Sequence, residues 1–424
     1  GSKAIVQFQG WNLPAQRVRI SNKDEEPGVT SIAVGKGRRA SNRVPFALDT
    51  LPESRDAEPN NTASAAQKIK LPVIINGRIH KPGDWDVFSF TGSKGDEVVA
   101  HVQARSLGSP MDSMLKITDS AGKTLAINDD HEDKGAGLIT HHADSMINFK
   151  LPADGTYLIH LGDTQNNGGL DCGYRLRIGP SQPDFALRVT PSGISARAGA
   201  TIPITVYALR KDGFTDSINL KLAGAPAGFS LSGARIPAGK DKLTLTMTMP
   251  YTPSREPVML NMVGTSVINR RSVSRRAVPA EDMMQAFLYR HLVTAENWMV
   301  VASKRGQWSP PWKLDKPGLL TLTPGKTAIV RLTGNRAFGA SQLQLELKTP
   351  PSGVSIGKIT HGARGAFSFE LKIDPAKARP GDTGNLMISA FIMRANKGKD
   401  GKKRPPRRQS MGFLPAVPFK IQQQ

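Results

Sequence analysis

Two short stretches of the sequence place oxygen-bearing side chains close together along the chain. These donors are the carboxylates and carboxamides of Asp56, Glu58, Asn60, Asn61, Asp84 and Asp86. Hard cations such as Ca²⁺ take roughly six to eight oxygen ligands. In an extended segment, positions 56, 58 and 60 point to one side, and a turn at Gly83 would bring the second stretch to the first. The pattern is compatible with a cation site, although a solvated polar loop is the more common structure for such a cluster.

A second polar run lies further along the chain. It comprises Asn128, Asp129, Asp130, His131, Glu132 and Asp133, followed by His141, His142 and Asp144. Three interpretations stay open. The side chains shape a turn through hydrogen bonds to the backbone, line a ligand surface, or bind a transition metal, for which Asp and His together are suitable ligands.

Two tryptophans, Trp308 and Trp312, flank the sequence Ser309-Pro310-Pro311. On a loop stiffened by two prolines, their indoles could form a platform on which sugar rings stack. The alternative is a proline-fixed turn that buries both rings.

A basic run precedes the final strand expected over residues 413–421. We expect a long, mobile hairpin loop that carries Lys397, Lys399, Lys402, Lys403, Arg404, Arg407 and Arg408. Such a density of positive charge suits the sulfate or carboxylate groups of a ligand, although a solvated loop is the default. A second basic region holds Arg270, Arg271, Arg275 and Arg276.

The composition limits the class of ligand and the compartment. The formal net charge of +22 favours attraction to an acidic polymer. Aromatic residues make up only 6% of the chain and do not alternate with basic ones, so nucleic acid is not the expected partner. The one cysteine, Cys172, excludes an internal disulfide and a cysteine zinc site. No apolar run reaches the length of a membrane span, so no membrane insertion is expected.

Sequence motifs for catalysis are missing. The chain holds no Gly-x-Ser-x-Gly elbow, His-Glu-x-x-His helix, phosphate loop or dinucleotide fingerprint. A Ser-His-Asp triad or a pair of carboxylates for glycoside hydrolysis is recognised by geometry rather than spacing. Because the chain carries none of the catalytic sequence motifs named above, we expect a protein that is not an enzyme.

Short β-branched or alternating runs between turn residues predict an all-β protein of tandem β-sandwiches. An internal repeat organises the second half. Residues 218–222 (INLKL) recur 125 positions later as residues 343–347 (LQLEL), and each run leads to a Pro-x-Gly turn, at Pro226 and Pro351. Two similar immunoglobulin-like sandwiches are the interpretation that fits best.

One segment between the two copies has a helical pattern. Pro279, Glu281 and Asp282 suit the start of a helix. Met283, Met284, Phe287, Leu288 and His291 then follow at helical spacing. We expect one short connecting helix over residues 280–294, which either packs between the domains or docks a partner.

The motifs of residues 56–180 arrive in the order and spacing of a known family. They comprise Glu58-Pro59-Asn60-Asn61 at the start, Gly83-Asp84-Trp85-Asp86, Asn128-Asp129-Asp130, Asp154-Gly155-Thr156-Tyr157 and the strand at Tyr174-Arg175-Leu176. This third of the chain resembles the bacterial pre-peptidase C-terminal (PPC) domain and is similar to the collagen-binding domains of clostridial collagenases. The resemblance implies a jelly-roll-like sandwich that binds calcium through the first motif and the Gly-Asp-x-Asp turn. Asp56 stands where that family has a glutamate, and we expect its shorter side chain to weaken the site.

Five segments follow from these patterns. We expect an incomplete β segment (1–55), the PPC-like sandwich (56–180), an immunoglobulin-like sandwich (181–279), the helical connector (280–294) and a second immunoglobulin-like sandwich (295–424). The two repeated sandwiches look like NEW3 or COG1470-type modules. The whole arrangement resembles large secreted proteins of planctomycete and verrucomicrobial bacteria.

The expected function is binding or adhesion to an extracellular polymer, most simply an acidic polysaccharide. The basic loops and Trp308 and Trp312 would make the contacts, and Ca²⁺ would stiffen the PPC-like domain. The protein would be secreted, periplasmic or on the bacterial cell surface. Two alternatives stay open: a structural spacer that binds an envelope protein, and an accessory region of a secreted peptidase or hydrolase.

Overall fold

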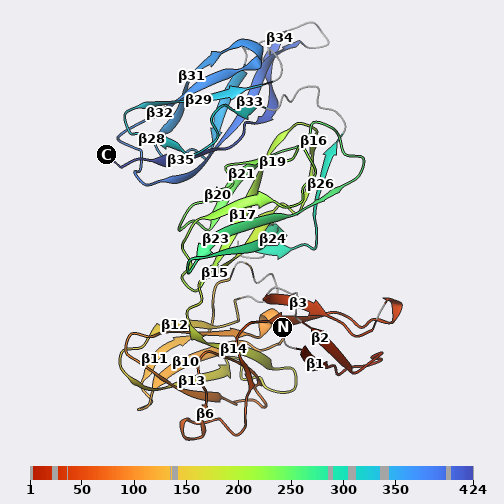
Figure 1. Cartoon of the computed structure of the whole chain (residues 1–424), viewed down its shortest axis with the longest axis vertical. Helices are drawn as coiled ribbons and strands as arrows, with labels where there is room; N and C mark the ends of the chain where they lie inside the picture. The colour runs from red at the N-terminus through yellow and green to blue at the C-terminus, as the bar shows by residue number, and fades with distance from the viewer. Residues whose placement is uncertain are drawn as a thin grey trace. The chain divides into compact units, whose positions relative to one another are not determined.

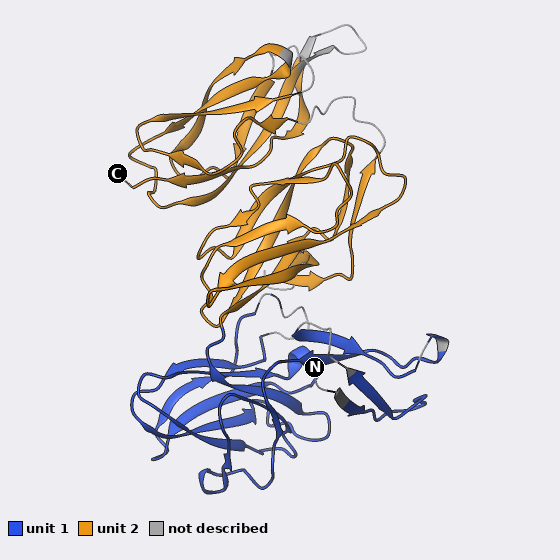
Figure 2. Ribbon diagram, in the orientation of Figure 1, with its two compact units in different colours: residues 1–182 blue, residues 183–424 orange. Residues whose placement is uncertain are grey.

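The computed structural model describes residues 3–21, 27–35, 37–133, 135, 142–284, 290–303, 312–334, 343–397 and 403–423. These residues form antiparallel and mixed β-sheets with a few short 3₁₀ turns, which confirms the predicted all-β class of tandem β-sandwiches (Figure 1). The chain divides into two compact units, residues 1–182 and residues 183–424 (Figure 2). None of the described helices has the length and apolar character needed to cross a lipid bilayer.

Unit 1 begins with two hairpins that belong to neither sheet of the sandwich. The first joins β1 (Lys3–Gln7) to β2 (Arg17–Ser21), and the second joins β3 (Gly28–Ile32) to β4 (Val44–Leu48), with η1 (Gly37–Arg39) between its strands. Next, β5 (Glu53–Arg55) pairs in parallel with β7 (Val73–Arg78). Residues 1–55 thus supply hairpins and an edge strand rather than a sandwich of their own.

The rest of unit 1 is a sandwich of two five-stranded sheets. One sheet has the order β11-β10-β13-β8-β6 and the other β12-β9-β14-β7-β5. The remaining bounds are η2 (Ala63–Ala65), β6 (Gln67–Lys68), β8 (Asp86–Gly92), β9 (Glu97–Gln103), η3 (Arg105–Leu107), β10 (Ser113–Asp119), β11 (Thr124–Asn128), β12 (Met146–Lys150), β13 (Gly155–Asp163) and β14 (Gly173–Pro180). Inward-facing side chains such as Phe88, Ile117, Ile159 and Leu176 fill the core between the sheets.

Unit 2 contains two sandwiches. The first uses one sheet of order β19-β21-β17-β15-β24-β23-β18-β20, with β25 paired to β24, and a second of order β16-β26-β22. Their bounds are β15 (Asp184–Thr190), β16 (Gly193–Arg197), β17 (Thr201–Lys211), β18 (Ile218–Leu222), β19 (Ser230–Ser232), β20 (Arg235–Ile236), β21 (Lys242–Thr248), β22 (Val258–Leu260), β23 (Met262–Ile268), β24 (Arg271–Met284), β25 (Arg290–Thr294) and β26 (Trp298–Ser303). Phe185, Leu245 and Trp298 lie in its core.

The second sandwich pairs a sheet of order β27-β29-β32-β31 with one of order β28-β35-β33-β30, in which β34 also pairs with β33. Their bounds are β27 (Lys313–Leu314), β28 (Leu320–Leu322), β29 (Thr327–Thr333), β30 (Leu343–Lys348), β31 (Val354–His361), η6 (Ala363–Gly365), β32 (Phe367–Ile373), β33 (Thr383–Lys397), β34 (Lys403–Phe413) and β35 (Val417–Ile421). Phe369, Leu371 and Ile421 lie in its core.

The helix expected over residues 280–294 is wrong wherever the structure describes that segment. Ala280–Met284 continue β24, and residues 290–294 form β25, which pairs antiparallel with them from Ala280↔Thr294 to Met284↔Arg290. Met283 and Met284 are exposed rather than packed as one buried stripe. Pairing with β25 satisfies the backbone, so tertiary context overrides the local pattern. Residues 285–289, which include Phe287 and Leu288, lie outside the described residues.

The predicted boundary between the repeated sandwiches also needs correction. Strand β26 pairs in parallel with β16 and antiparallel with β22. Residues 298–303 therefore belong to the first sandwich, which extends well past the expected end at residue 279. The second sandwich begins after this strand rather than at residue 295. Strand β26 follows the β24–β25 hairpin, and nothing in its own sequence indicates which sheet it joins.

Candidate metal centre

The structure brings the six predicted ligands together at one end of the unit 1 sandwich. Asp56 directly follows β5, and its amide donates to the carbonyl oxygen of Asn76 (3.2 Å). The carbonyl oxygen of Asn60 accepts a hydrogen bond from the amide of Val87 in β8 (3.0 Å). These two hydrogen bonds connect the segment 56–60 to both sheets and so fix its position beside Asp86.

A turn over Lys81–Asp84 places Asp84 and Asp86, the second stretch of predicted ligands, beside the first. The amide of Asp84 donates to the carbonyl oxygen of Lys81 (3.1 Å), and Gly83 adopts φ +77°, a conformation that favours glycine. Asp84 and Asp86 then point toward Glu58, and one oxygen from each of these three carboxylates lies within 4.8 Å of the others. Asp56, Glu58 and His80 form an adjoining group of the same dimensions.

Two carboxylates of this cluster are buried. Asp86 and Asn60 are fully inaccessible, and Asp84 is 3% exposed. Burial, the largest influence, and the negative charges of Asp56, Asp84 and Glu58 together raise the pKa of Asp86 to about 7, although a hydrogen bond from Tyr174 lowers it. A buried group of like charges is costly unless a cation neutralises it.

The amides around the carboxylates complete a polar shell. Asn61 donates from Nδ2 to Oδ1 of Asp84, and the amide of His80 donates to Oδ2 of Asp84 (2.8 Å). The amide of Asn60 donates to Oε2 of Glu58 (3.0 Å). With its carboxamide swapped, Asn60 donates to Asp86 and Glu58, each at 3.3 Å. These amides act as donors to the carboxylates, and a bound cation would require the carboxamides to turn their oxygens inward.

His80 belongs to the cluster although the sequence pattern did not indicate it. Its Nδ1 lies 3.0 Å from Oε1 of Glu58 and 4.0 Å from Oδ2 of Asp84, and about half of the side chain is exposed. Its position just after β7 places it beside the Lys81–Asp84 turn. A single histidine next to a strand carries no spacing signal, so only the fold could reveal it.

Tyr174 is the second residue that the sequence did not indicate. It lies in β14, and its hydroxyl donates to Oδ2 of Asp86 at 2.5 Å. Burial and the nearby carboxylate of Asp86 raise the pKa of Tyr174 well above its usual value, so the phenol stays a donor. The approach depends on Gly77 in β7, because a Cβ there would lie 2.2 Å from the tyrosine oxygen.

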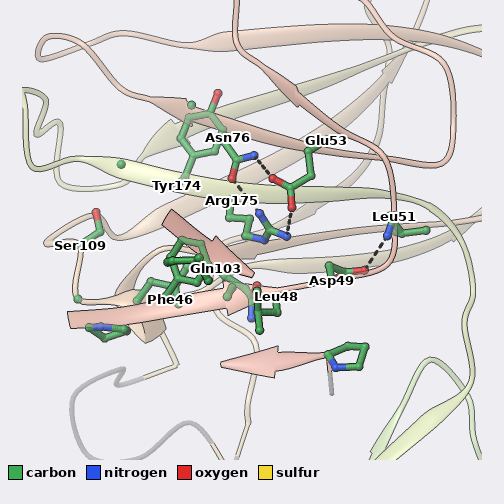
Figure 3. Close-up of a pocket in the computed structure, with 18 of the residues that line it drawn as sticks. Phe46, Leu48, Asp49, Leu51, Glu53, Asn76, Gln103, Ser109, Tyr174 and Arg175 are labelled. Carbon is green, nitrogen blue, oxygen red and sulfur yellow. Dashed lines mark hydrogen bonds and ion pairs between the residues drawn. The ribbon is translucent and has the colours of Figure 1, made fainter. Parts of the chain in front are cut away.

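The same tyrosine lines a groove of about 1150 Å³ between β4 and the sheet that contains β7 and β14 (Figure 3). Its floor holds Arg175, which binds Oε1 of Glu53 (2.8 Å) and Oδ1 of Asn76 (3.0 Å), as the dashed lines in Figure 3 show. Phe46 and Leu48 of β4 form its apolar wall. The two opposite charges in this part of the groove, Arg175 and Glu53, are therefore paired with each other.

The second polar run is a structured turn where it is described. Asn128 accepts from the amide of Met146 at Oδ1 (2.8 Å) and donates from Nδ2 to the carbonyl oxygen of Asp130 (2.8 Å). The carboxylate of Asp144 accepts from the amides of Ala104, Arg105 and Ser106 (2.7–3.0 Å) and so holds η3. These bonds favour the turn interpretation for Asn128 and Asp144. His141 lies outside the described residues.

The proposed tryptophan platform is not present at Trp312. Its side chain is 5% exposed, lies in the core of the second sandwich and packs edge-to-face on Phe367 (5.7 Å between ring centres). The ring of Trp312 is therefore buried, as the alternative interpretation had it, while Pro310 and Pro311 lie outside the described residues. Trp308 lies outside the described residues.

The basic run before the last strand is not a loop over most of its length. Lys403, Arg404, Arg407 and Arg408 lie in β34, which pairs with β33 from Ser389↔Phe413 to Lys397↔Lys403. The long β33 supplies a partner for the backbone of the run, which the polar sequence alone did not suggest. Lys402 and Lys399 lie outside the described residues.

Comparison with known proteins supports the family resemblance of this region. Residues 84–162 match the family described as bacterial pre-peptidase C-terminal domain. The chain is also similar to a probable subtilase-type serine protease of Deinococcus radiodurans, with 42% identity over 111 residues. That match takes in 24% of this chain and 14% of the protease, so the chain spans a small part of its relative.

Among solved structures, domains 4–9 of the surface layer protein SbsC align with 80% of this chain and 48% of their own, at 11% identity and a TM-score of 0.25. A TM-score this low does not establish a common fold.

Proposed function

We propose that the PPC region binds Ca²⁺ through Glu58, Asp84 and Asp86, with Asp56, Asn60 and Asn61 completing the oxygen shell. The observation that carries this proposal is the convergence of three carboxylates within 4.8 Å, two of them on buried residues. Among the described residues, none of the three forms an ion pair with a lysine or arginine. A hard divalent cation supplies the missing positive charge and accepts carboxylate and amide oxygens.

The role of the cation is structural rather than catalytic. The ligands come from three separate places, namely the segment after β5, the Lys81–Asp84 turn and the start of β8. A cation held by all three joins the edge of one sheet to a strand of the other. Because it binds only the folded arrangement, it adds to stability by about 2.7 kcal/mol at a free concentration of roughly one hundred times Kd.

We further propose that the whole chain is a non-catalytic accessory or surface protein outside the cell that binds an acidic polysaccharide. The match of residues 84–162 to the PPC family and the similarity to part of a subtilase-type protease support an extracellular setting. The net charge of +22 supports an acidic ligand. The same similarity to a protease keeps an accessory region of a secreted peptidase as the second candidate.

Calorimetry of the whole chain in EDTA and in Ca²⁺ tests the cation site. We expect Ca²⁺ to raise the melting temperature of one transition in the wild type, and Asp84→Asn to abolish most of that shift. Glu97→Gln is the matched control, because Glu97 is an exposed carboxylate in β9 of the same sandwich. Equal melting curves with and without Ca²⁺ for the wild type would refute the site.

A further inference from the structure

The two sandwiches of unit 2 share one pattern of strand pairing. In the first, β17 pairs with β21, β18 with β23, and β16 in parallel with β26. In the second, β29 pairs with β32, β30 with β33, and β28 in parallel with β35. The sequence repeat is thus a repeat of topology. It follows that the β23–β24 hairpin and the β33–β34 hairpin occupy equivalent places.

Both equivalent hairpins are rich in cations. The β23–β24 hairpin turns through Asn269 and Arg270, both with positive φ (49° and 63°), and pairs Ile268 with Arg271 directly after the turn. Arg270, Arg271 and Arg276 are exposed and form no ion pair with any described residue, whereas Arg275 binds Asp184 (3.0 Å). We call this hairpin, residues 262–276, the first arm.

In the β33–β34 hairpin, like charges occupy directly opposite positions of the register. Arg394 is paired with Arg407, and Lys397 with Lys403. Arg407 is exposed and forms no ion pair with any described residue. Like charges at directly opposite positions destabilise a sheet, so sheet stability does not account for this order of residues. We call the strand residues 389–397 and 403–413 the second arm.

One cation of the second arm is held in place. Arg408 lies 3.6 Å from the ring centre of Phe391 and binds the carboxylate of Glu346. Glu346 also binds Lys348 (2.7 Å), so this carboxylate is shared between two cations. The negative charge near the arm is thus already occupied, which leaves the positions around Arg407 with an excess of positive charge for a ligand.

We propose that the two arms are equivalent docking sites for the sulfate or carboxylate groups of one acidic polysaccharide chain, which unit 2 therefore binds at two places. Guanidinium groups suit such anions because they bind them with two parallel hydrogen bonds. Several cations along one hairpin match a ligand with repeated charges rather than a single small anion. This inference rests on the proposed binding of an acidic polysaccharide and adds where the polymer binds and how many sites it uses.

Two docking sites on one chain have a measurable consequence. When a long polymer occupies one arm, its second contact becomes intramolecular, so the affinity exceeds that of either arm alone. A fragment too short to span both arms binds to each one independently. The number of fragments bound per protein chain therefore equals the number of arms. The gain in affinity for a long polysaccharide measures how far the two arms bind it together.

Heparin and heparin tetrasaccharides serve as sulfated probes, and polygalacturonate with its short oligomers as carboxylated ones, in titration calorimetry of the full chain at low salt. Arg270→Asn/Arg271→Ser removes charge from the first arm, and asparagine tolerates the left-handed backbone. Arg394→Ser/Arg407→Ser removes one opposed pair from the second arm. Lys240→Ser/Lys326→Ser is the control, which removes one exposed lysine from a turn of each sandwich.

We expect two tetrasaccharides per wild-type chain and one per chain for each arm variant. Affinity for long heparin should fall at least about tenfold in each arm variant and less than about twofold in the control. The Arg394→Ser/Arg407→Ser variant should also melt no lower than the wild type, because it removes a like-charge pair. This second readout separates loss of binding from loss of folding.

The failures of the two proposals are distinguishable. One fragment per wild-type chain, or loss of all binding in a single arm variant, would overturn the two-arm inference and leave polysaccharide binding in place. A wild type that binds neither sulfated nor carboxylated polymer would overturn both proposals. Binding of duplex DNA without binding of either polysaccharide would do the same and would assign the arms to a nucleic acid.

Discussion

The hydroxyl of Tyr174 donates a 2.5 Å hydrogen bond to Oδ2 of Asp86, across the interior of the unit 1 sandwich. Tyr174 lies in β14 and Asp86 opens β8, which belong to different sheets. One buried bond therefore connects the candidate cation site to the opposite sheet. The tyrosine also lines the neighbouring groove, so the site and the groove share one side chain.

Replacement of this tyrosine should weaken cation binding. Tyr174→Phe removes the donor that lowers the pKa of Asp86, so protons compete more strongly for the carboxylate near neutral pH. We expect Ca²⁺ affinity to fall several-fold at about pH 7 and to recover as the pH rises. Titration calorimetry with Ca²⁺ between about pH 6 and 8 measures this. Tyr157→Phe is the control, because Tyr157 loses a bond to the carbonyl of Ala153 (2.7 Å) instead. Equal Ca²⁺ affinities for both variants would contradict a positioning role for Tyr174.

A methyl group at position 77 should displace the same tyrosine. In Gly77→Ala the new Cβ would lie 2.2 Å from the oxygen of Tyr174, and overpacking of this kind costs about 1–3 kcal/mol. We expect a lower melting temperature in EDTA and a smaller stabilisation by Ca²⁺. Gly155→Ala, where a Cβ meets nothing within 4 Å, provides the comparison. If the two alanine variants melt together, the close packing of Gly77 against Tyr174 is not a constraint.

The cation-free protein should lose stability as the pH rises from about 4 to about 7. The pKa of Asp86 is about 7 in the folded state and 3.8 in its ordinary range. Across that window the folded state binds a proton that the unfolded chain has released, so the free energy of unfolding falls with pH, by at most about 1.4 kcal/mol per pH unit. The loss is complete above about pH 7.

Calorimetry in EDTA across this range checks the sign of the pH dependence. Asp86→Asn should flatten the curve, because it removes the titrating group, and saturating Ca²⁺ should remove the decline in the wild type. A cation-free wild type whose calcium-sensitive transition becomes more stable from about pH 5 to 7 would refute the assignment to Asp86.

Trp312 should matter for folding and not for ligand contact. Trp312→Ala removes a buried ring that packs on Phe367 and should destabilise the second sandwich by about 3–5 kcal/mol. Trp312→Phe should cost less and leave heparin affinity unchanged. A large loss of affinity in Trp312→Phe, with the melting temperature retained, would show that the indole contacts the ligand after all.

The sequence predicted those features that depend on short-range patterns. Alternating runs identified strands such as β21, and the spacing of Asp56, Glu58, Asp84 and Asp86 identified side chains that the fold brings together. The PPC resemblance is confirmed for residues 84–162. The resemblance of the two repeated sandwiches to NEW3 or COG1470-type modules, and the bacterial groups named with it, stay predictions.

Features that depend on distant pairing could not be predicted in this way. His80 reaches the candidate site from the segment just after β7, and Tyr174 from β14, and no spacing rule connects either residue to it. The apolar residues around Met283 mimic a helix, but their backbone pairs with β25. The polar residues Lys403 to Arg408 look like a loop, but β33 is long enough to pair with them.

The parallel pairing of β16 with β26 has a consequence for biosynthesis. The two strands are more than one hundred positions apart, from Gly193↔Met299 to Arg197↔Ser303. A nascent chain that has emerged only as far as β24 still lacks the strand that lies between β16 and β22. The ribosome must therefore release residue 303 before this sandwich can close, and the edges of β16 and β22 stay open to chaperones or neighbouring chains until then.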